Sequence, residues 1–178
     1  MEHIKKAAVV VLGMFDGVHR GHRALVAMAK QLADSEGVPC IVYTFANHPA
    51  ELLGRKVVML TTNAERERLL KEAGADEVLM EPFTEELRDL DMGDFLKHLE
   101  DLFDVRGLAC GFNYTFGKFG AGKPADLMAY GKEKGIPVRV LESVDMGGKP
   151  VSSTRVRAAL ADGDTRSAES LLGHHLGE

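Results

Sequence analysis

The chain has 178 residues, of which 45% are hydrophobic and 28% charged, and its formal net charge is −5. This length fits one domain with a sizeable core, and the ordinary composition is that of a globular protein. The acidic balance argues against a general nucleic-acid binder, which would usually be basic, but a locally basic site can still bind small anions.

The N-terminal apolar run predicts neither a membrane span nor a signal peptide. The letters MEHIKK lead directly into AAVVVLG, whereas a spanning helix needs about 20 apolar residues. Cys40 and Cys110 lie inside apolar runs, which favours buried thiols over a disulfide framework. We therefore expect a cytoplasmic protein without a membrane partner, and the sequence does not indicate its oligomeric state.

Five segments are typical of strands, and helical patterns lie between them. The predicted strands cover residues 7–12, 38–45, 77–80, 107–110 and 138–141. The first is continuously apolar, as in a strand covered on both faces. Apolar spacing and capping signals predict helices that end near Gly37 and Gly74, one that starts at Asp91 or Gly93 and continues through DFLKHLEDLF, and others over 125–134, 153–161 and 165–172.

This alternation predicts a doubly wound, Rossmann-like α/β domain over residues 1–178. We expect a mostly parallel five-stranded sheet with helices on both faces, and the last two helices packed on the same core. Ligands of such folds bind at the carboxyl ends of the strands. Polar stretches, three of them with glycine, do follow four of the strands: GMFDGVHRGH, FANHP, GFNYTFGKFGAGK and GGKPVSSTRVR.

The first of these loops places His19 and His22 three residues apart. A metal site would need more ligands, for which His48 is the obvious candidate. A phosphate site would give each of these residues a role. Gly13 turns the chain, and His22 lies in the first turn of a helix, where free N–H groups favour an anion. Gly21 would let a nucleotide lie close to the backbone. We favour phosphate, with a metal site or a structural role as the alternatives.

The third loop contains GKFGAGK, which has the spacing of a phosphate-binding P-loop. Pro124 stands where a P-loop carries Ser or Thr, and the segment lies too far beyond its strand. We favour a loop that contacts a flat ring through Tyr114, Phe116 and Phe119. A flexible glycine loop, or three aromatic core residues, are the alternatives.

The last loop, KPVSSTRVR, has three basic side chains and no acidic one. Ser152 or Ser153 could cap the helix that follows. The helix N-terminus beside arginines would form a second anion site, suited to a leaving pyrophosphate. We expect Arg157 to bind there and Arg155 to point to solvent.

The segments GMFDGVHRGH, TFANHP, GFNYTFGKFGAG and VSSTRVR, in this order, resemble the FMN adenylyltransferase (FAD synthetase) domain of the bacterial bifunctional riboflavin kinase/FAD synthetases. HRGH resembles the HxGH signature of the nucleotidyltransferase superfamily, and the resemblance covers about residues 9–172. Asn47 departs from it, since many relatives carry proline there. Those enzymes have a second, C-terminal riboflavin kinase domain, which we expect to be absent because this chain ends about where it would begin.

The resemblance implies the reaction ATP + FMN → FAD + pyrophosphate, by direct in-line attack of the FMN phosphate without a general base or a covalent enzyme intermediate. Mg²⁺ would accompany ATP and bridge phosphate oxygens, because no carboxylate cluster offers a metal cage. A related nucleotidyltransferase with another phosphate-bearing acceptor, a non-catalytic flavin- or ATP-binding module, and a metal-dependent hydrolase are the alternatives.

The resemblance also implies roles for individual residues. The catalytic residues would be His19, His22 and Arg157, with a protonated imidazole expected to help most at the ATP phosphates. ATP-binding residues would be Gly13, Phe15, Asp16, Gly21, Ser152, Ser153 and Thr154. Flavin-binding residues would be His48, Asn113, Thr115, Phe116 and Gly117.

Overall fold

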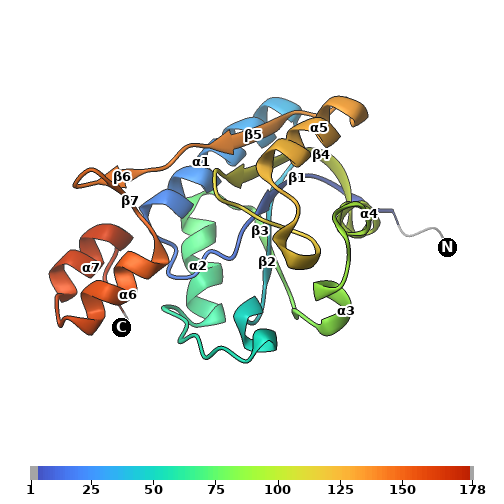
Figure 1. Cartoon of the computed structure of the whole chain (residues 1–178). Coiled ribbons are helices and arrows are strands. Elements are labelled where there is room, and N and C mark those ends of the chain that lie inside the picture. Colours follow the sequence, from blue (N-terminus) through green and yellow to red (C-terminus); the bar gives the residue numbers. More distant parts are fainter. Residues whose placement is uncertain (1–3, 177–178) are drawn as a thin grey trace.

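Five strands form one sheet in the computed structural model, which describes residues 4–176 (Figure 1). They are β1 (Lys6–Leu12), β2 (Cys40–Phe45), β3 (Glu77–Glu81), β4 (Phe103–Gly111) and β5 (Val138–Leu141), in the order β3-β2-β1-β4-β5. Every neighbouring pair is parallel. The predicted α/β sheet is confirmed, and it is parallel throughout.

Helices cover both faces of this sheet, as expected. Side chains of β1 alternate between the faces, so Val9 and Val11 pack toward α1 (Arg20–Glu36) and α2 (Asn63–Ala73). On the other face, Val10 and Leu12 pack among apolar residues of α3 (Glu85–Arg88), α4 (Met92–Leu102) and α5 (Pro124–Lys134). Burial on both faces explains why β1 is apolar at consecutive positions rather than at alternate ones. No helix within residues 4–176 has the length and apolarity needed to cross a membrane.

The boundary between α4 and β4 differs from the expectation. The helix ends at Leu102, and Phe103 has the extended backbone of a strand, with φ −134° and ψ 153°. β4 therefore begins four residues before the predicted start, because Phe103 pairs with Lys6 of β1 and is buried in the core. The helix α3 and two 3₁₀ turns, Pro49–Leu53 and Lys118–Gly120, were not predicted. Segments of three to five residues are too short to show a helical period.

The last two helices do not pack on the sheet core, so that expectation was wrong. After β5 the chain forms a short antiparallel hairpin of β6 (Asp145–Met146) and β7 (Lys149–Pro150), followed by α6 (Ser153–Ala161) and α7 (Thr165–Leu172). These helices form a separate apolar cluster with Leu60 and Val144. Because the chain leaves the sheet at the carboxyl end of β5, α6 and α7 lie beside the loops rather than over a sheet face (Figure 1).

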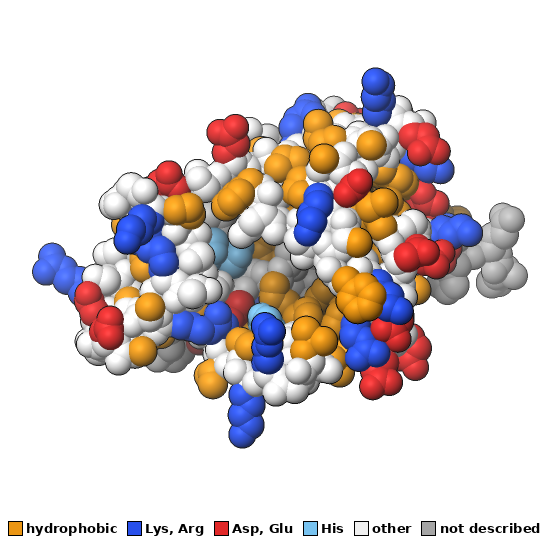
Figure 2. All heavy atoms as spheres, in the orientation of Figure 1, with side chains coloured by type: hydrophobic (Ala, Val, Ile, Leu, Met, Phe, Trp, Pro, Cys, Tyr) orange, Lys and Arg blue, Asp and Glu red, His pale blue; other side chains and the backbone are white. Residues whose placement is uncertain are grey.

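The strand order reverses between β1 and β4, which are neighbours in the sheet although β1 is followed in sequence by β2. The loops after these two strands therefore run to opposite sides and leave a crevice at the carboxyl edge. Open α/β sheets bind their ligands at such a point. Figure 2 shows this face hollowed, with hydrophobic side chains inside the hollow and Lys and Arg side chains around it.

Gly131 of α5 tests the packing of the helix layer. A Cβ atom at this position would lie 2.4 Å from Cγ2 of Val138 and 2.8 Å from the carbonyl oxygen of Ile136. We expect Gly131→Ala to lower the free energy of unfolding in urea by about 1–3 kcal/mol, as overpacking does. Gly93→Ala, at an exposed site in α4 where a Cβ atom would make only an ordinary contact of 3.6 Å with Oδ1 of Asp91, is the matched control. It should leave stability unchanged or raise it by up to about 1 kcal/mol, and equal losses in both variants would contradict the packing argument.

Candidate active site

His19 and His22 hold the N-terminus of α1 through a reciprocal pair of hydrogen bonds. The backbone N–H of His22 donates to Nδ1 of His19, and the N–H of His19 donates to Nδ1 of His22, both at 3.2 Å. The two rings are stacked, with centroids 3.5 Å apart. Because each Nδ1 accepts a hydrogen bond, each neutral ring carries its proton on Nε2. The helix start therefore presents two imidazole N–H donors, and no acidic residue lies in its first turn.

Both rings are neutral near pH 7. Burial lowers the pKa of His19 to about 4. Burial also lowers the pKa of His22 well below its usual range, and electrostatic repulsion from Arg66 and from His19 in its protonated form lowers it further. The expectation that a protonated imidazole helps most applies to the ATP complex and stays a prediction. In the unliganded protein a proton on Nδ1 would remove the acceptor of a backbone N–H. The pair is built as neutral donors in the unliganded protein.

Glycines at 13 and 21 make room for aromatic rings of the protein itself. A Cβ atom on Gly13 would lie 3.0 Å from the Phe15 ring, and one on Gly21 would lie 3.0 Å from Cε1 of His19. Phe15 is fully buried, adopts a positive φ of 57° and meets the His22 ring edge-on at 5.3 Å. The buried Phe15 ring therefore packs against the His22 ring.

Asp16 joins the HRGH loop to the start of α6. One carboxylate oxygen accepts a hydrogen bond from the Leu60 backbone N–H at 2.8 Å, and the other pairs with the Arg157 guanidinium. The Ser153 hydroxyl donates to the Asp16 carbonyl oxygen at 2.7 Å. The structure thus brings Asp16, Ser153 and Arg157 together with the two histidines' loop, although 141 residues separate Asp16 from Arg157.

The other residues of the α6 segment have distinct positions. Ser152 is the N-cap of α6, and its hydroxyl accepts from the Arg155 N–H at 3.1 Å, while Thr154 is exposed. Arg155 does not point to solvent, so that expectation was wrong. Its guanidinium donates to the carbonyl oxygens of Met146, Lys149 and Pro150, which fixes the β6–β7 hairpin.

Arg66 is a buried cation at this edge that the sequence analysis did not identify. Its guanidinium donates to the carbonyl oxygens of Met14, at 2.7 Å, and Phe45, at 2.6 Å. It also donates to Oγ1 of Thr44 and Oδ1 of Asn63. The side chain is fully buried and no carboxylate is among these partners. Burial lowers the pKa of Arg66 to about 10, so the group stays charged at neutral pH.

A signal for Arg66 was present in the sequence. It lies three and four residues before Leu69 and Leu70, which are the other buried residues of α2. A basic residue on the apolar face of a helix is rarely buried without a specific partner. That position alone could have marked Arg66 as a site residue.

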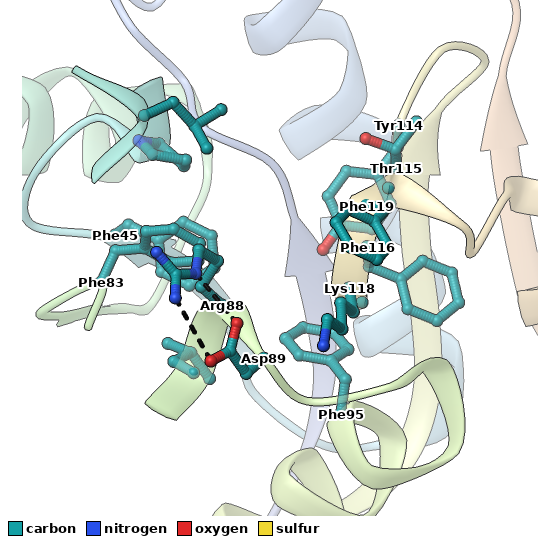
Figure 3. A pocket seen from close by; sticks show the side chains of 15 residues that line it. Phe45, Phe83, Arg88, Asp89, Phe95, Tyr114, Thr115, Phe116, Lys118 and Phe119 are labelled. Carbon is teal, nitrogen blue, oxygen red and sulfur yellow. Dashed lines mark hydrogen bonds and ion pairs between the residues drawn. The ribbon is translucent and has the colours of Figure 1, made fainter. Parts of the chain in front are cut away.

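A cavity of about 800 Å³ opens beside these loops (Figure 3). It is lined by Phe45, Pro49, Leu53, Phe83, Leu87, Arg88, Asp89, Phe95, Tyr114, Thr115, Phe116, Gly117, Lys118, Phe119 and Gly120. Three of the five predicted flavin-binding residues, Thr115, Phe116 and Gly117, lie in this lining, whereas His48 and Asn113 do not. Most of the other walls come from the segments after β2 and β3, in which the sequence analysis singled out only His48 as a flavin-binding residue.

Phe116 belongs to the core and to the cavity wall at once. Its side chain is 5% exposed and packs against Phe95, with ring centroids 5.5 Å apart, and against Tyr114 at 5.9 Å. A Cβ atom on Gly122 would lie 2.6 Å from the Phe116 ring, so this glycine lets the loop fold over it. The two interpretations of the aromatic loop, core and binding surface, are therefore compatible.

The segment after β2 is shaped by its own polar side chains. His48 is the N-cap of the Pro49–Leu53 turn, and its Nδ1 accepts from the Ala50 N–H at 3.1 Å. Asn47 pairs with both the N–H and the carbonyl oxygen of Phe83. Asn47 thereby ties this loop to the segment after β3 and fixes two walls of the cavity.

The side chains described in the structure do not form a metal site of their own. Within residues 4–176, no three His, Cys, Asp or Glu side chains are grouped so that they could hold a metal ion. Both carboxylate oxygens of Asp16 are already engaged. Cys40 and Cys110 are buried free thiols, as predicted, and burial raises the pKa of both.

Comparisons with known proteins agree with this geometry. Among solved structures, one described as a macrolide-efflux protein from Streptococcus pneumoniae matches with a TM-score of 0.87 and 30% identity, over 99% of this chain and 58% of that one. Curated relatives include two proteins named bifunctional riboflavin kinase/FMN adenylyltransferase. The one from Listeria monocytogenes is 32% identical, over 93% of this chain and 54% of its own length. The one from Escherichia coli K12 is 37% identical, over 96% and 55%.

The chain thus spans about half the length of these curated relatives. The family model for FAD synthetase matches residues 1–155, which include the HRGH loop, the aromatic loop and the SST segment. By this match, the chain belongs to the FAD synthetase family.

Proposed function

We propose that this protein transfers the adenylyl group of ATP to FMN, giving FAD and pyrophosphate. The observation that carries the proposal is the pair of Nε2–H donors of His19 and His22 at the start of α1, next to a cavity lined with aromatic residues. Membership of the FAD synthetase family and the names of the curated relatives support it.

The proposed chemistry depends on positioning and charge. The FMN phosphate is already an anionic nucleophile near neutral pH, so the reaction needs no general base. The protein must bring two polyanions into line and stabilise charge that develops on the α-phosphate. We assign this task to the Nε2–H groups of His19 and His22 and the backbone N–H groups at the start of α1, with Gly13 and Gly21 allowing close approach.

Arg157 would bind the β- and γ-phosphates from the other side, together with Ser152, Ser153 and Thr154. In the unliganded protein its guanidinium pairs with Asp16 and also donates to the Val58 carbonyl oxygen. Asp16 therefore holds Arg157 near the HRGH loop before ATP arrives. Leaving pyrophosphate would meet the same cation.

The cavity would bind the isoalloxazine ring of FMN, with Thr115, Phe116 and Gly117 as contacts. Its volume of about 800 Å³ lies in the usual range for small-molecule sites. His48 and Asn113 would act outside this cavity, toward the ribityl phosphate. Mg²⁺ would arrive with ATP and be held by phosphate oxygens and water, because the donors within residues 4–176 do not form a cage.

We also propose that residues 1–178 form one nucleotidyltransferase domain, and that the protein is cytoplasmic. The first proposal is supported by the five-stranded sheet, whose loops after β1, β2 and β4 carry most segments of the site, and by the contacts of Asp16 that join α6 to them. The second is supported by two buried free thiols, which fit a reducing compartment.

Incubation of the protein with ATP, Mg²⁺ and either FMN or riboflavin, followed by chromatography, tests the function. We expect FAD and pyrophosphate from FMN, and no FMN from riboflavin. Stoichiometric binding of FMN and ATP without pyrophosphate release would instead indicate a non-catalytic module. Adenylylation of another phosphate-bearing acceptor in place of FMN would indicate a different nucleotidyltransferase.

Variants of His22 separate the role of Nδ1, which accepts the His19 N–H, from the proposed role of Nε2–H as a donor to phosphate. In His22→Asn the side-chain oxygen can still accept the His19 N–H, but the Nε2–H donor is lost. We expect turnover to fall about 10²–10³-fold while the denaturation midpoint stays at the wild-type value. His22→Ala loses the cap as well and should also be destabilised by about 1 kcal/mol. His175→Ala, with a side chain 91% exposed, is the control that should keep full turnover. Wild-type turnover in folded His22→Asn would rule out the donor role.

The protonation of His19 can be read by ¹⁵N NMR of the unliganded protein. At pH 6 we expect a neutral ring with the proton on Nε2, whereas an unperturbed histidine, with a pKa near 6.5, would be mostly charged. Because the pKa of His19 is lower in the folded state than in the unfolded state, this group's contribution to stability is present above pH 6.5. It is lost as the pH falls from 6.5 toward 4. Titration of His19 near 6.5, or a proton on Nδ1, would contradict the neutral-donor arrangement.

A further inference from the structure

Phe119 differs from every other aromatic residue that lines the cavity. Its side chain is 94% exposed, whereas Phe95 and Phe116 are 3% and 5% exposed. It nevertheless belongs to the lining, at the tip of the loop that follows β4 (Figure 3). An exposed aromatic side chain at the rim of an apolar cavity extends the surface that the cavity offers to a ligand.

The backbone holds Phe119 in an unfavourable conformation. Its φ of 60° and ψ of 18° lie in the left-handed region, which is uncommon for a bulky L-residue. Gly117 and Gly120, on either side, have φ of 76° and 61°, which suit glycine. Among the described residues, the ring's recorded contact is the Lys118 ammonium, 5.3 Å from the ring centroid. Packing in the free protein therefore does not explain why phenylalanine occupies this position.

The base of the loop is fixed, so the tip has a defined place. Phe116 and Gly122 exchange two backbone hydrogen bonds, at 3.1 and 2.8 Å, and close the loop at its neck. The Lys118 N–H donates to the Leu90 carbonyl oxygen at 2.7 Å, which anchors the loop to the connection before α4. Gly117 lies so close to Met92 that a Cβ atom would be 3.0 Å from its backbone. The loop thus presents Phe119 at the cavity rim from a rigid base.

We infer that Phe119 stacks on the outer face of the flavin ring and so selects a planar acceptor. This inference rests on the proposed function, because it assigns a further residue to the same FMN site. Phe116 and Phe95 form the buried inner wall of the cavity. On its open side, Phe119 provides an aromatic face for the ring. Stacking would cover the ring's exposed surface and restrict binding to acceptors with an extended flat ring.

Fluorescence of FMN tests this placement directly. A tryptophan in contact with a flavin ring quenches its emission, so FMN bound to Phe119→Trp should be quenched far more strongly than FMN bound to the wild type. Phe112→Trp is the matched control, because Phe112 is 47% exposed on the same loop but does not line the cavity. Equal quenching in the two tryptophan variants would overturn the inference.

Affinity gives the second measurement. We expect Phe119→Ala to raise the Kd for FMN and the KM for FMN about tenfold, which corresponds to about 1.4 kcal/mol. The KM for ATP and the urea midpoint should stay at wild-type values, because the exposed Phe119 ring packs neither at the proposed ATP site nor in the core. Phe119→Ala with a wild-type Kd for FMN would overturn the inference alone. Failure of the wild-type protein to bind FMN would instead overturn the proposed function.

Discussion

The arrangement of the site depends on one buried cation. Arg66 reaches from α2 to the carbonyl oxygens of Met14 and Phe45, which follow β1 and end β2, and no acidic group is among its partners. Burying a guanidinium is costly unless it is hydrogen-bonded, and an apolar residue could fill the same volume. These hydrogen bonds fix the two loops before any ligand arrives. They also leave a positive charge without a carboxylate partner at this edge of the sheet, in a chain whose net charge is −5.

The two chemistries of the site lie on different parts of the same sheet edge. Polar donors cluster where the loop after β1 meets α6, through the contacts of Asp16 with Leu60, Ser153 and Arg157. Apolar walls come from the segments after β2, β3 and β4. FMN has the same division, since its ring is flat and largely apolar and its phosphate is anionic. Because the strand order reverses between β1 and β4, one crevice can accommodate both ends of such a molecule.

The sequence predicted those features that depend on local pattern. The start of β1 was predicted to within one residue, β5 was predicted with its observed bounds, and the capping box before α2 lies at Thr62 and Glu65. Features that depend on distant contacts were not predicted. The cavity combines residues from separate loops, and Asp16 pairs with Arg157 although the two residues are far apart in sequence. The prediction that Arg155 points to solvent was wrong, because its partners are carbonyl groups of a hairpin too short to be recognised from the sequence.

The histidine pair shows why the protein needs its arginines. Each Nδ1 accepts a backbone N–H, so neither ring can take a proton there without losing a hydrogen bond at the start of α1. Neutral imidazoles can direct a phosphate through their Nε2–H groups, but they supply no net charge. The counter-charge for two polyanions must come from groups that stay charged at neutral pH. Arg157 is partly neutralised by Asp16 in the free protein. In the proposed reaction the histidines would therefore orient the phosphates, and the positive charge would come from Arg66 and from Arg157 once ATP displaces Asp16 from it.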